Sequence, residues 1–240
     1  MTARSWKFES SPGHHRQFSL IQTKGHPLST ETYAKAVEIH LHQNDLPAGL
    51  DWGDTIAVDT ETQGLSLIRD RLCVVQISTG DGVCHLVQFS GDDFSAPNLK
   101  ALMTDPNVTK VFHYARFDVS MMKQWLDITI HPIYCTKIAS KLIRTYTDRH
   151  GLKDVTRELL GIELSKQQQS SDWAAQTLSQ DQLDYAASDV LNLLMIKHKL
   201  DIMLAREGRT LLAQSCFDFL GTRGDLDLMG WSEVDIFSHS

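Results

Sequence analysis

Short hydrophobic runs separated by polar turns dominate the chain from Thr55 onwards. The runs TIAV, LCVVQIS and VCHLVQF are rich in β-branched residues, and the sequence TGDG at 79–82 is typical of a hairpin turn between the last two. This pattern predicts three adjacent antiparallel strands. The run TKVFH at 109–113 predicts a fourth strand, so strands come first along the chain and helices dominate afterwards.

Segments with apolar residues at helical spacing follow these strands. They predict helices around NLKALM and over residues 115–126, 135–145, 152–160 and 180–206.

The last of these helices has the clearest limits. Ser179 is its expected N-cap, Gln182 completes a capping box, and Gly208 is its expected stop. One face of this helix is expected to pack on the sheet. The apolar residues of that face are Leu183, Ala186, Val190, Leu193 and Leu194.

Length and composition indicate one sizeable folded domain. The 240 residues are 42% hydrophobic, which suffices for a single core. Residues 1–34 are polar without a sustained period, so we expect a flexible leader before a single domain over residues 35–240. The pair His14-His15 in that leader could bind a metal, but a solvated dipeptide is the simpler interpretation.

Cysteine usage and charge narrow the function classes. The 4 cysteines form no C-x-x-C pair, which argues against a zinc ribbon or disulfide framework and favours the reducing cytoplasm. No stretch approaches the roughly 18 apolar residues of a membrane span, so no membrane partner is expected. The net charge of −7 argues against holding long nucleic acid on a basic face. Residues 137–166 nevertheless form a local basic region.

Two carboxylates are expected on one face of the first strand. Because strand side chains alternate, Asp59 and Glu61 in IAVDTE point the same way. Like charges beside an apolar strand cost free energy unless a cation lies between them, and hard divalent cations prefer oxygen ligands. The pair indicates a Mg²⁺ or Mn²⁺ site, although a pair simply exposed to water would give the same sequence.

Two further acidic residues stand where they could join this pair. Asp118 in HYARFD is expected in the first turn of a helix after the strand TKVFH, where it could also merely favour the helix dipole. In YAASD, a spacing of four places Tyr185 and Asp189 on one helix face. Asp189 adjoins the buried flank at Val190, and an unpartnered carboxylate there is costly, so a solvated charge is the weaker interpretation.

Four acids of this kind would form an all-oxygen cage for two cations about 4 Å apart that clamp a phosphoryl group. One cation would activate water, and the other would stabilise the leaving 3′ oxygen. Tyr185 is a poor base at neutral pH because the free phenol has a pKa of about 10, so it would orient the attacking water. The combination predicts metal-assisted phosphodiester hydrolysis.

The motif order V-D-T-E-T, H-x-A-x-F-D and Y-x-x-x-D resembles that of the DEDDy 3′-5′ exonucleases of the ribonuclease D type. The resemblance implies an α/β, ribonuclease H-like exonuclease fold whose central mixed sheet of about five strands is flanked by helices. It also implies two Mg²⁺ or Mn²⁺ ions per site and release of nucleoside 5′-monophosphates. The implied metal ligands are Asp59, Glu61, Asp118 and Asp189, with Tyr185 as the water-orienting residue.

Over residues 36–240 the sequence is similar to the nanoRNase branch of this family. The similarity is carried by CTKIASKLIRTYTDRHGLK, LSKQQQSSDWAAQTLS and GWSEVDIFSHS. It implies a preference for very short single-stranded RNA, especially linear diribonucleotides, and a homo-oligomer in the form of a ring of eight. None of the C-terminal helical domains of ribonuclease D is expected, which fits short substrates.

Nine residues are expected to contact substrate. Leu65 follows a flexible Gly64, and the resemblance implies a leucine wedge between two bases there, although an ordinary loop leucine is the alternative. The basic region could receive a terminal 5′ phosphate or hold solvated charges. His113 could touch substrate or satisfy a backbone carbonyl. The set is Thr62, Leu65, His113, Phe117, Arg144, Arg149, His150, Lys166 and Gln169.

The C-terminal segment, about 221–240, is too apolar to remain in water without association. We expect it to dock either on its own domain or on a neighbouring subunit. The leading functional hypothesis is a metal-dependent exoribonuclease for very short RNA. The alternatives are a broader RNA or DNA exonuclease and a catalytically silent RNA-binding module, and the complete set of acids with Tyr185 disfavours the latter.

Overall fold

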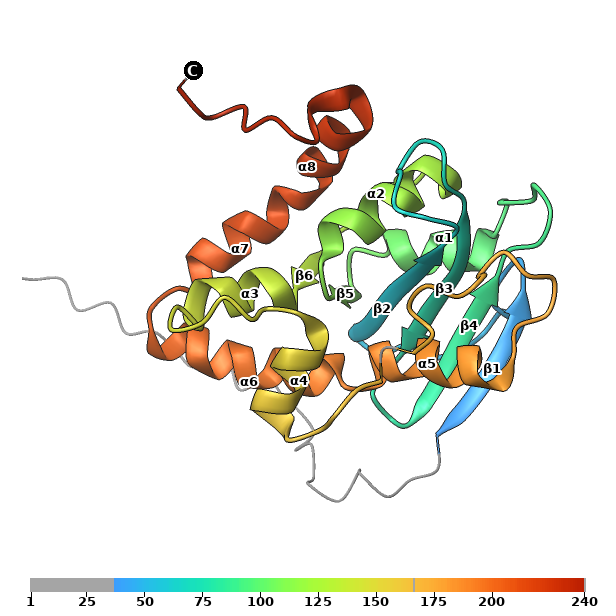
Figure 1. Cartoon of the computed structure of the whole chain (residues 1–240), viewed down its shortest axis with the longest axis horizontal. Helices are drawn as coiled ribbons and strands as arrows, with labels where there is room; N and C mark the ends of the chain where they lie inside the picture. The colour runs from blue at the N-terminus through green and yellow to red at the C-terminus, as the bar shows by residue number, and fades with distance from the viewer. Residues whose placement is uncertain (1–36, 166, 240) are drawn as a thin grey trace, which may run out of the picture. The chain divides into compact units, whose positions relative to one another are not determined.

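A computed structural model of the chain describes residues 37–165 and 167–239 (Figure 1). The predicted leader over residues 1–34 lies outside the described residues. Within the described part, each helix is too short or too polar to cross a membrane.

A mixed sheet of six strands forms the centre of the fold, with the spatial order β1-β4-β3-β2-β5-β6. The neighbours β2, β3 and β4 are antiparallel, as the sequence predicted, whereas β1 pairs with β4, and β5 with β2 and β6, in parallel. The strands are β1 (Glu38–Gln43), β2 (Thr55–Thr62), β3 (Leu72–Ser78), β4 (Val83–Gln88), β5 (Thr109–Phe112) and β6 (Ile133–Cys135).

The two outermost strands, β1 and β6, were not predicted individually. In β1 the sequence EIHLHQ has only Ile39 and Leu41 as apolar residues, and neither is fully buried. β6 has 3 residues, too few to show a period. Backbone pairing forms both strands: β1 follows β4 in register from Glu38 to Gln43. Such partners lie far away along the chain and leave no local pattern.

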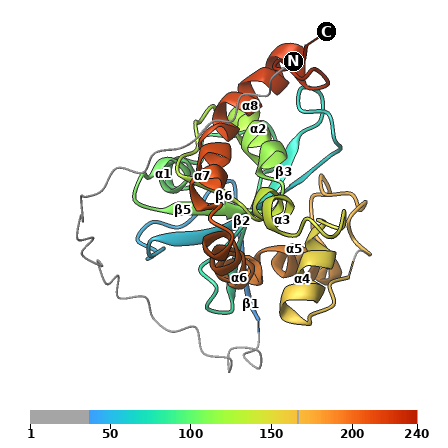
Figure 2. The ribbon, with the colours of Figure 1, turned by 90° about the vertical axis from the view of Figure 1, so that its left-hand side faces the viewer.

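Helices flank both faces of the sheet (Figures 1 and 2). α5 contacts β2, β3 and β4 on one face, and α1 and α2 lie behind the sheet in the view of Figure 1. The predicted helices at 115–126 and 152–160 are confirmed with those bounds. The helices are α1 (Pro97–Thr104), α2 (Ala115–Leu126), α3 (Thr136–Ile143), α4 (Leu152–Leu160), α5 (Gln180–Leu191), α6 (Leu193–Arg206), α7 (Thr210–Asp218), α8 (Leu220–Leu226) and the irregular turn η2 (Asp227–Trp231).

The predicted helix over 180–206 is two helices, α5 and α6. Asn192 separates them, and its backbone N–H turns back to the carbonyl of Val190 instead of continuing the helical ladder. The expected limits are confirmed: Ser179 and Gln182 form a reciprocal capping box, and Gly208 follows the end with φ of 65°. Apolar periodicity continues across the break, so the pattern alone did not reveal it.

The beginning of the C-terminal segment packs on its own domain. α8 lies against α2 so closely that a Cβ on Gly224 would be 2.9 Å from Ser120 Oγ. Asp227 is buried and pairs with Arg116 and Arg223. Beyond this anchor, Met229 is 71% exposed and Phe237 is 78% exposed. The segment is thus docked near Asp227 and leaves apolar side chains in solvent.

Candidate active site

Three elements bring the four predicted carboxylates together. β2 supplies Asp59 and Glu61, α5 supplies Asp189, and each of these residues offers an oxygen within 4.8 Å of the other two. α2 supplies Asp118 from its first turn, where one carboxylate oxygen accepts a hydrogen bond of 2.6 Å from Thr60 Oγ1. Residues 130 positions apart in the chain therefore form one acidic cluster.

The pKa values of all four carboxyl groups are raised, so each ionises less readily than a free carboxyl group. Burial, followed by the charges of Asp118, Asp189 and Glu61, raises the pKa of Asp59 well above its usual value. Burial and the charges of Asp189 and Asp118 likewise raise the pKa of Glu61. The pKa values of Asp118 and Asp189 are raised chiefly by burial. Like charges that share a desolvated site cannot all be ionised without a counter-ion.

These residues fit divalent cations. The cluster offers only carboxylate oxygens, which are the ligands that Mg²⁺ and Mn²⁺ prefer. Within the described residues no Lys or Arg forms an ion pair with any of the four acids, so the protein itself does not neutralise them. Bound cations would remove the repulsion that raises the pKa values.

A cavity of about 300 Å³ opens over the cluster. Asp59, Glu61 and Asp189 line it together with Tyr185 and the predicted contacts His113 and Gln169. Burial and the neighbouring carboxylates raise the pKa of Tyr185 above that of a free phenol, so its hydroxyl keeps its proton at neutral pH. A protonated hydroxyl can orient water by hydrogen bonding but cannot act as a general base.

His113 lines the cavity as a neutral imidazole. Its Nδ1 lies 2.9 Å from Thr136 Oγ1, and its Nε2 is buried without a hydrogen-bond partner among the described residues. Burial, followed by the charge of Lys137, lowers the pKa of His113 to about 3. His113 therefore contributes a neutral ring to the wall of the cavity.

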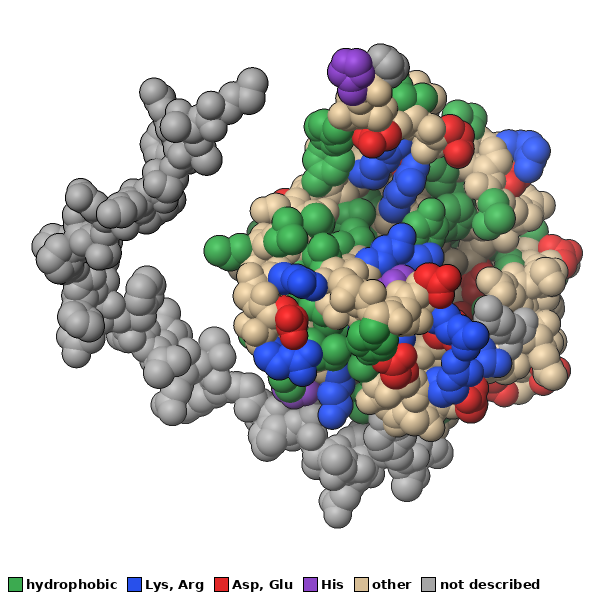
Figure 3. Space-filling model, turned by 60° about the vertical axis from the view of Figure 1, so that its left-hand side comes forward, with side chains coloured by type: hydrophobic (Ala, Val, Ile, Leu, Met, Phe, Trp, Pro, Cys, Tyr) green, Lys and Arg blue, Asp and Glu red, His purple; other side chains and the backbone are tan. Residues whose placement is uncertain are grey.

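Sequence reasoning missed part of the cavity wall. Lys137 and Lys153 line it, as do Leu152, Leu164 and Ser165. Both lysines belong to the basic region noticed at 137–166, but nothing local distinguished them from its other cations. Figure 3 shows Lys and Arg side chains gathered over α3 and α4, the two helices that carry Lys137 and Lys153.

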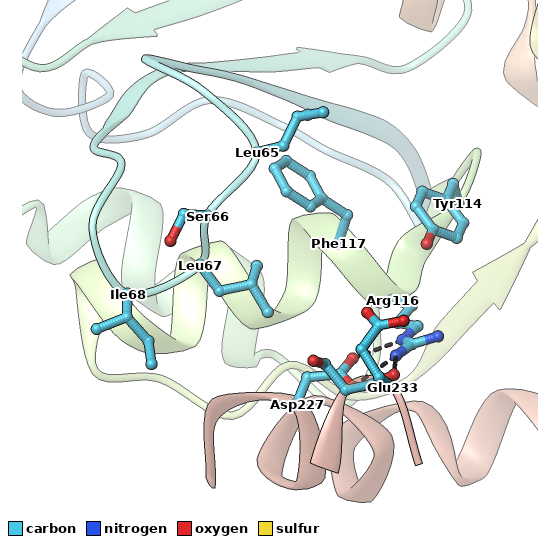
Figure 4. A pocket seen from close by; sticks show the side chains of 10 residues that line it. Leu65, Ser66, Leu67, Ile68, Tyr114, Arg116, Phe117, Asp227 and Glu233 are labelled. Atoms are coloured by element: carbon cyan, nitrogen blue, oxygen red, sulfur yellow. Dashed lines mark hydrogen bonds and ion pairs between the residues drawn. The ribbon is translucent and has the colours of Figure 1, made fainter. Parts of the chain in front are cut away.

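Leu65 and Phe117 line a different cavity, of about 490 Å³ (Figure 4). It lies between residues 65–68, the start of α2 and the C-terminal segment. Leu65 is 86% exposed there, so it is not a core leucine. Thr62, the last residue of β2, uses its hydroxyl to bond the carbonyl of Gly64 at 2.6 Å and so begins the loop that carries Leu65.

The predicted phosphate contacts Arg144, Arg149 and His150 differ in burial and in their hydrogen-bond partners. Arg144 is fully buried, and its guanidinium donates to Glu158, to Ser140 Oγ and to the carbonyl of Arg149. His150 Nδ1 lies 2.9 Å from the same Ser140 Oγ.

Neither Arg144 nor His150 lines the cavity, because these partners hold them in the packing between α3 and α4. The Arg149 side chain is exposed. Lys166 lies outside the described residues. Among the predicted phosphate contacts that the structure describes, only Gln169 lies at the cavity over the carboxylates.

A mixed α/β sheet with four acids clustered beside its central strand fits the class of metal-dependent nucleases. Residues 31–205 match the family described as 3′-5′ exonuclease. The chain belongs to this family. The solved structure of Brucella melitensis NrnC bound to pGG is 55% identical, covers 85% of this chain and all of that one, and gives a TM-score of 0.82.

Two further comparisons agree with this membership. Brucella melitensis NrnC with bound Mg²⁺ is 54% identical over 85% of this chain and 100% of that chain, with a TM-score of 0.81. Ribonuclease D of Acidiphilium cryptum is 32% identical over 154 residues, which is 64% of this chain and 39% of that protein. The chain thus spans about two fifths of the length of the curated relatives it matches. The predicted family and fold are confirmed.

Proposed function

We propose that this protein is a metal-dependent 3′-5′ exoribonuclease that hydrolyses very short oligoribonucleotides, especially linear diribonucleotides, to nucleoside 5′-monophosphates. The observation that carries this proposal is the cluster of Asp59, Glu61, Asp118 and Asp189 beside Tyr185. A relative 55% identical was solved with pGG bound, which supports a substrate of dinucleotide size.

The four carboxylates would hold two Mg²⁺ or Mn²⁺ ions. When bound, such ions supply an activated water and stabilise the charge on the leaving oxygen. A relative with bound Mg²⁺ supports the choice of metal. Thr60 keeps Asp118 oriented toward this site through its hydrogen bond.

The other cavity residues would position the RNA. Tyr185 keeps its proton and orients the attacking water through its hydroxyl. Lys137 and Lys153 would attract a phosphate to the wall of the cavity, and His113 would offer its unpartnered Nε2 to the substrate. Gln169 adds an amide that can donate or accept. We assign no phosphate contact to Arg144, because it already pairs with Glu158.

We also propose that the chain acts as a homo-oligomer, with a ring of eight as the expected state, in the cytoplasm. The apolar side chains left in solvent beyond Asp227 support a subunit contact, because such groups associate in water.

The test is a time course with 5′-labelled RNAs, from dinucleotides to strands of about twenty nucleotides, in Mg²⁺ or Mn²⁺ with an EDTA control. The expected result is that dinucleotides disappear much faster than longer strands and that EDTA stops the reaction. Equal shortening of all lengths would refute the length preference and leave a broader exonuclease. Absence of cleavage with either metal would overturn the enzymatic proposal in favour of a binding module.

A further inference from the structure

Three histidines gather on the outer part of the sheet, away from the acidic cluster. His40 and His42 alternate along β1 and so share one face of that strand. His85 on β4 is the register partner of His40. The ring centres lie 5.1 Å apart for His40 and His85, 5.3 Å for His42 and His85, and 6.3 Å for His40 and His42. All three side chains are half-buried.

The nitrogens of these rings approach one another. His42 Nε2 lies 3.0 Å from His85 Nδ1, and the edge of Trp52 packs against His85. Glu38, on the same face of β1, places Oε1 2.9 Å from His40 Nε2. Four potential ligands from two hydrogen-bonded strands therefore share one small area of the surface.

The charge state of the cluster suits a metal ion. Burial, and then the neighbouring histidines, lower the pKa values of His42 and His85. Both rings are thus neutral at pH 7, and a bound cation would replace the hydrogen bond between His42 Nε2 and His85 Nδ1. Asp81 and Glu38 add negative charge near His85.

The ring spacing suits ligands of one ion, but the three rings lie nearly parallel, at 12° to 21° to one another, so the side chains must turn for their nitrogens to converge on a metal. Zinc binds imidazole nitrogen at about 2.0–2.1 Å, and each nitrogen lies about 1.1 Å from its ring centre, so two ligand rings on one ion have centres about 5 Å apart. Two of the three observed spacings, 5.1 Å and 5.3 Å, are close to this value, and the third is 6.3 Å. We propose that His40, His42 and His85, with Glu38 as an oxygen ligand, form a binding site for a borderline transition-metal ion such as Zn²⁺.

This site would be distinct from the catalytic cluster in place and in chemistry. His85 lies opposite Ile77 on β3, whereas Asp59 lies opposite Gln76, so side-chain alternation puts the histidines on the other face of the sheet from Asp59. Imidazole ligands favour zinc, copper or nickel, while the all-carboxylate cluster favours magnesium or manganese. A metal bound here would tie the edge strand β1 to β4, whatever reaction the protein catalyses.

The experiment titrates the full chain with Zn²⁺ by calorimetry. Because Zn²⁺ can also displace Mg²⁺ from the carboxylate cluster, the histidine site is identified by the Zn²⁺ equivalent whose binding the histidine variants weaken. Co²⁺ serves as a spectroscopic probe, because its visible absorption reports nitrogen ligands and tetrahedral geometry. We expect one ion at this site, and His85→Gln and His42→Gln should each weaken its binding by at least about 10-fold, since even loss of an outer partner of a ligand costs that much. His198→Gln, on the exposed face of α6, is the matched control and should bind like the wild type.

Circular dichroism and RNA hydrolysis in Mg²⁺ check that each variant is folded. Wild-type protein that binds no Zn²⁺ under these conditions would overturn the site. The same conclusion would follow if folded His85→Gln and His42→Gln kept wild-type affinity, or if His14→Gln/His15→Gln, outside the cluster, lost it. These results are independent of whether the RNA is cleaved.

Discussion

At the scale of single residues, the buried carboxylates of the acidic cluster lower the stability of the fold. Asp118 and Asp189 are almost completely buried, which raises their pKa values, and their charges in turn raise the pKa values of Asp59 and Glu61. A protein selected only for stability would place neutral side chains here. Thr60 stabilises the ionised form of Asp118 through one hydrogen bond of 2.6 Å. Bound cations would be needed to neutralise the other carboxylates.

Asp189→Asn removes one expected ligand while keeping the shape of the side chain. We expect RNA hydrolysis to fall by at least about 10²–10³-fold, comparable to the loss of one preorganised electrostatic group in other enzymes. Initial rates on a labelled dinucleotide in Mg²⁺ measure the effect. Asp184→Asn on the exposed side of the same helix is the control, and turnover equal to that control would contradict the cage.

The same variant also has a stability signature in EDTA. Because the folded-state pKa values of these carboxyls are raised, the native state holds more protons than the unfolded state, and stability falls as pH rises above the unfolded value of about 4. Asp189→Asn should lose less stability over this range than wild-type protein. Urea denaturation at several pH values tests this, and parallel pH dependences would argue that Asp189 is not part of the repulsive cluster.

The sequence alone identified some residues of the site but not others. The acids and Tyr185 could be chosen because carboxylates on apolar faces are conspicuous and their motif order resembles a known family. Arg144 could not be judged in the same way, because its partner Glu158 lies on another helix and only the fold brings them together. Lys137 and Lys153 gave no local signal for the cavity.

At the scale of elements, the loop between β2 and β3 is built to hold its shape. Asp70 is buried, its carboxylate accepts from the backbone N–H of Ser66 at 2.8 Å, and its carbonyl accepts from Trp125 Nε1 at 3.1 Å. A Cβ on Gly64 would lie 2.3 Å from the Asp70 carboxylate, so the loop closes tightly around this acid. The loop thus presents an exposed Leu65 from a fixed frame.

Leu65→Ala tests whether that presentation serves substrate binding. A leucine that becomes buried against bases would contribute about 1.5–2 kcal/mol, so we expect the KM for a dinucleotide to rise by about 10-fold, with a smaller change in the dependence on Mg²⁺. Steady-state kinetics at several Mg²⁺ concentrations separates the two effects. Ile202→Ala, an exposed apolar residue on α6, is the control, and an equal loss of dinucleotide and metal binding would count against a wedge.

Elements also differ in how far their sequences define them. The capping box of α5 and the limits of α2 and α4 follow from local residue patterns and were predicted correctly. The break at Asn192 and the edge strand β1 depend on tertiary packing and on pairing with β4, so the pattern of apolar residues could not reveal them.

At the scale of the whole molecule, the C-terminal segment has an anchored part and a free part. Arg116 on α2 binds the buried carboxylate of Asp227 (Figure 4). Arg223 on α8 binds the same carboxylate, and Arg116 also donates to the carbonyl of Ser232. This network holds the segment beside the start of the helix that carries Asp118. Past it, the exposed apolar side chains of Val234 and Phe237 are available to a second copy of the chain.

The double variant Ile236→Ser/Phe237→Ser separates these two parts, because it leaves Asp227 and its arginines in place. If the free part joins subunits, the molar mass measured by light scattering should fall toward that of one chain, 27.1 kDa, while circular dichroism stays unchanged. Leu211→Ser, an 83% exposed leucine on α7, is the matched control for a general loss of surface hydrophobicity. A double variant that keeps the wild-type mass would show that subunit association does not depend on these side chains, and the segment would then serve chiefly to brace α2.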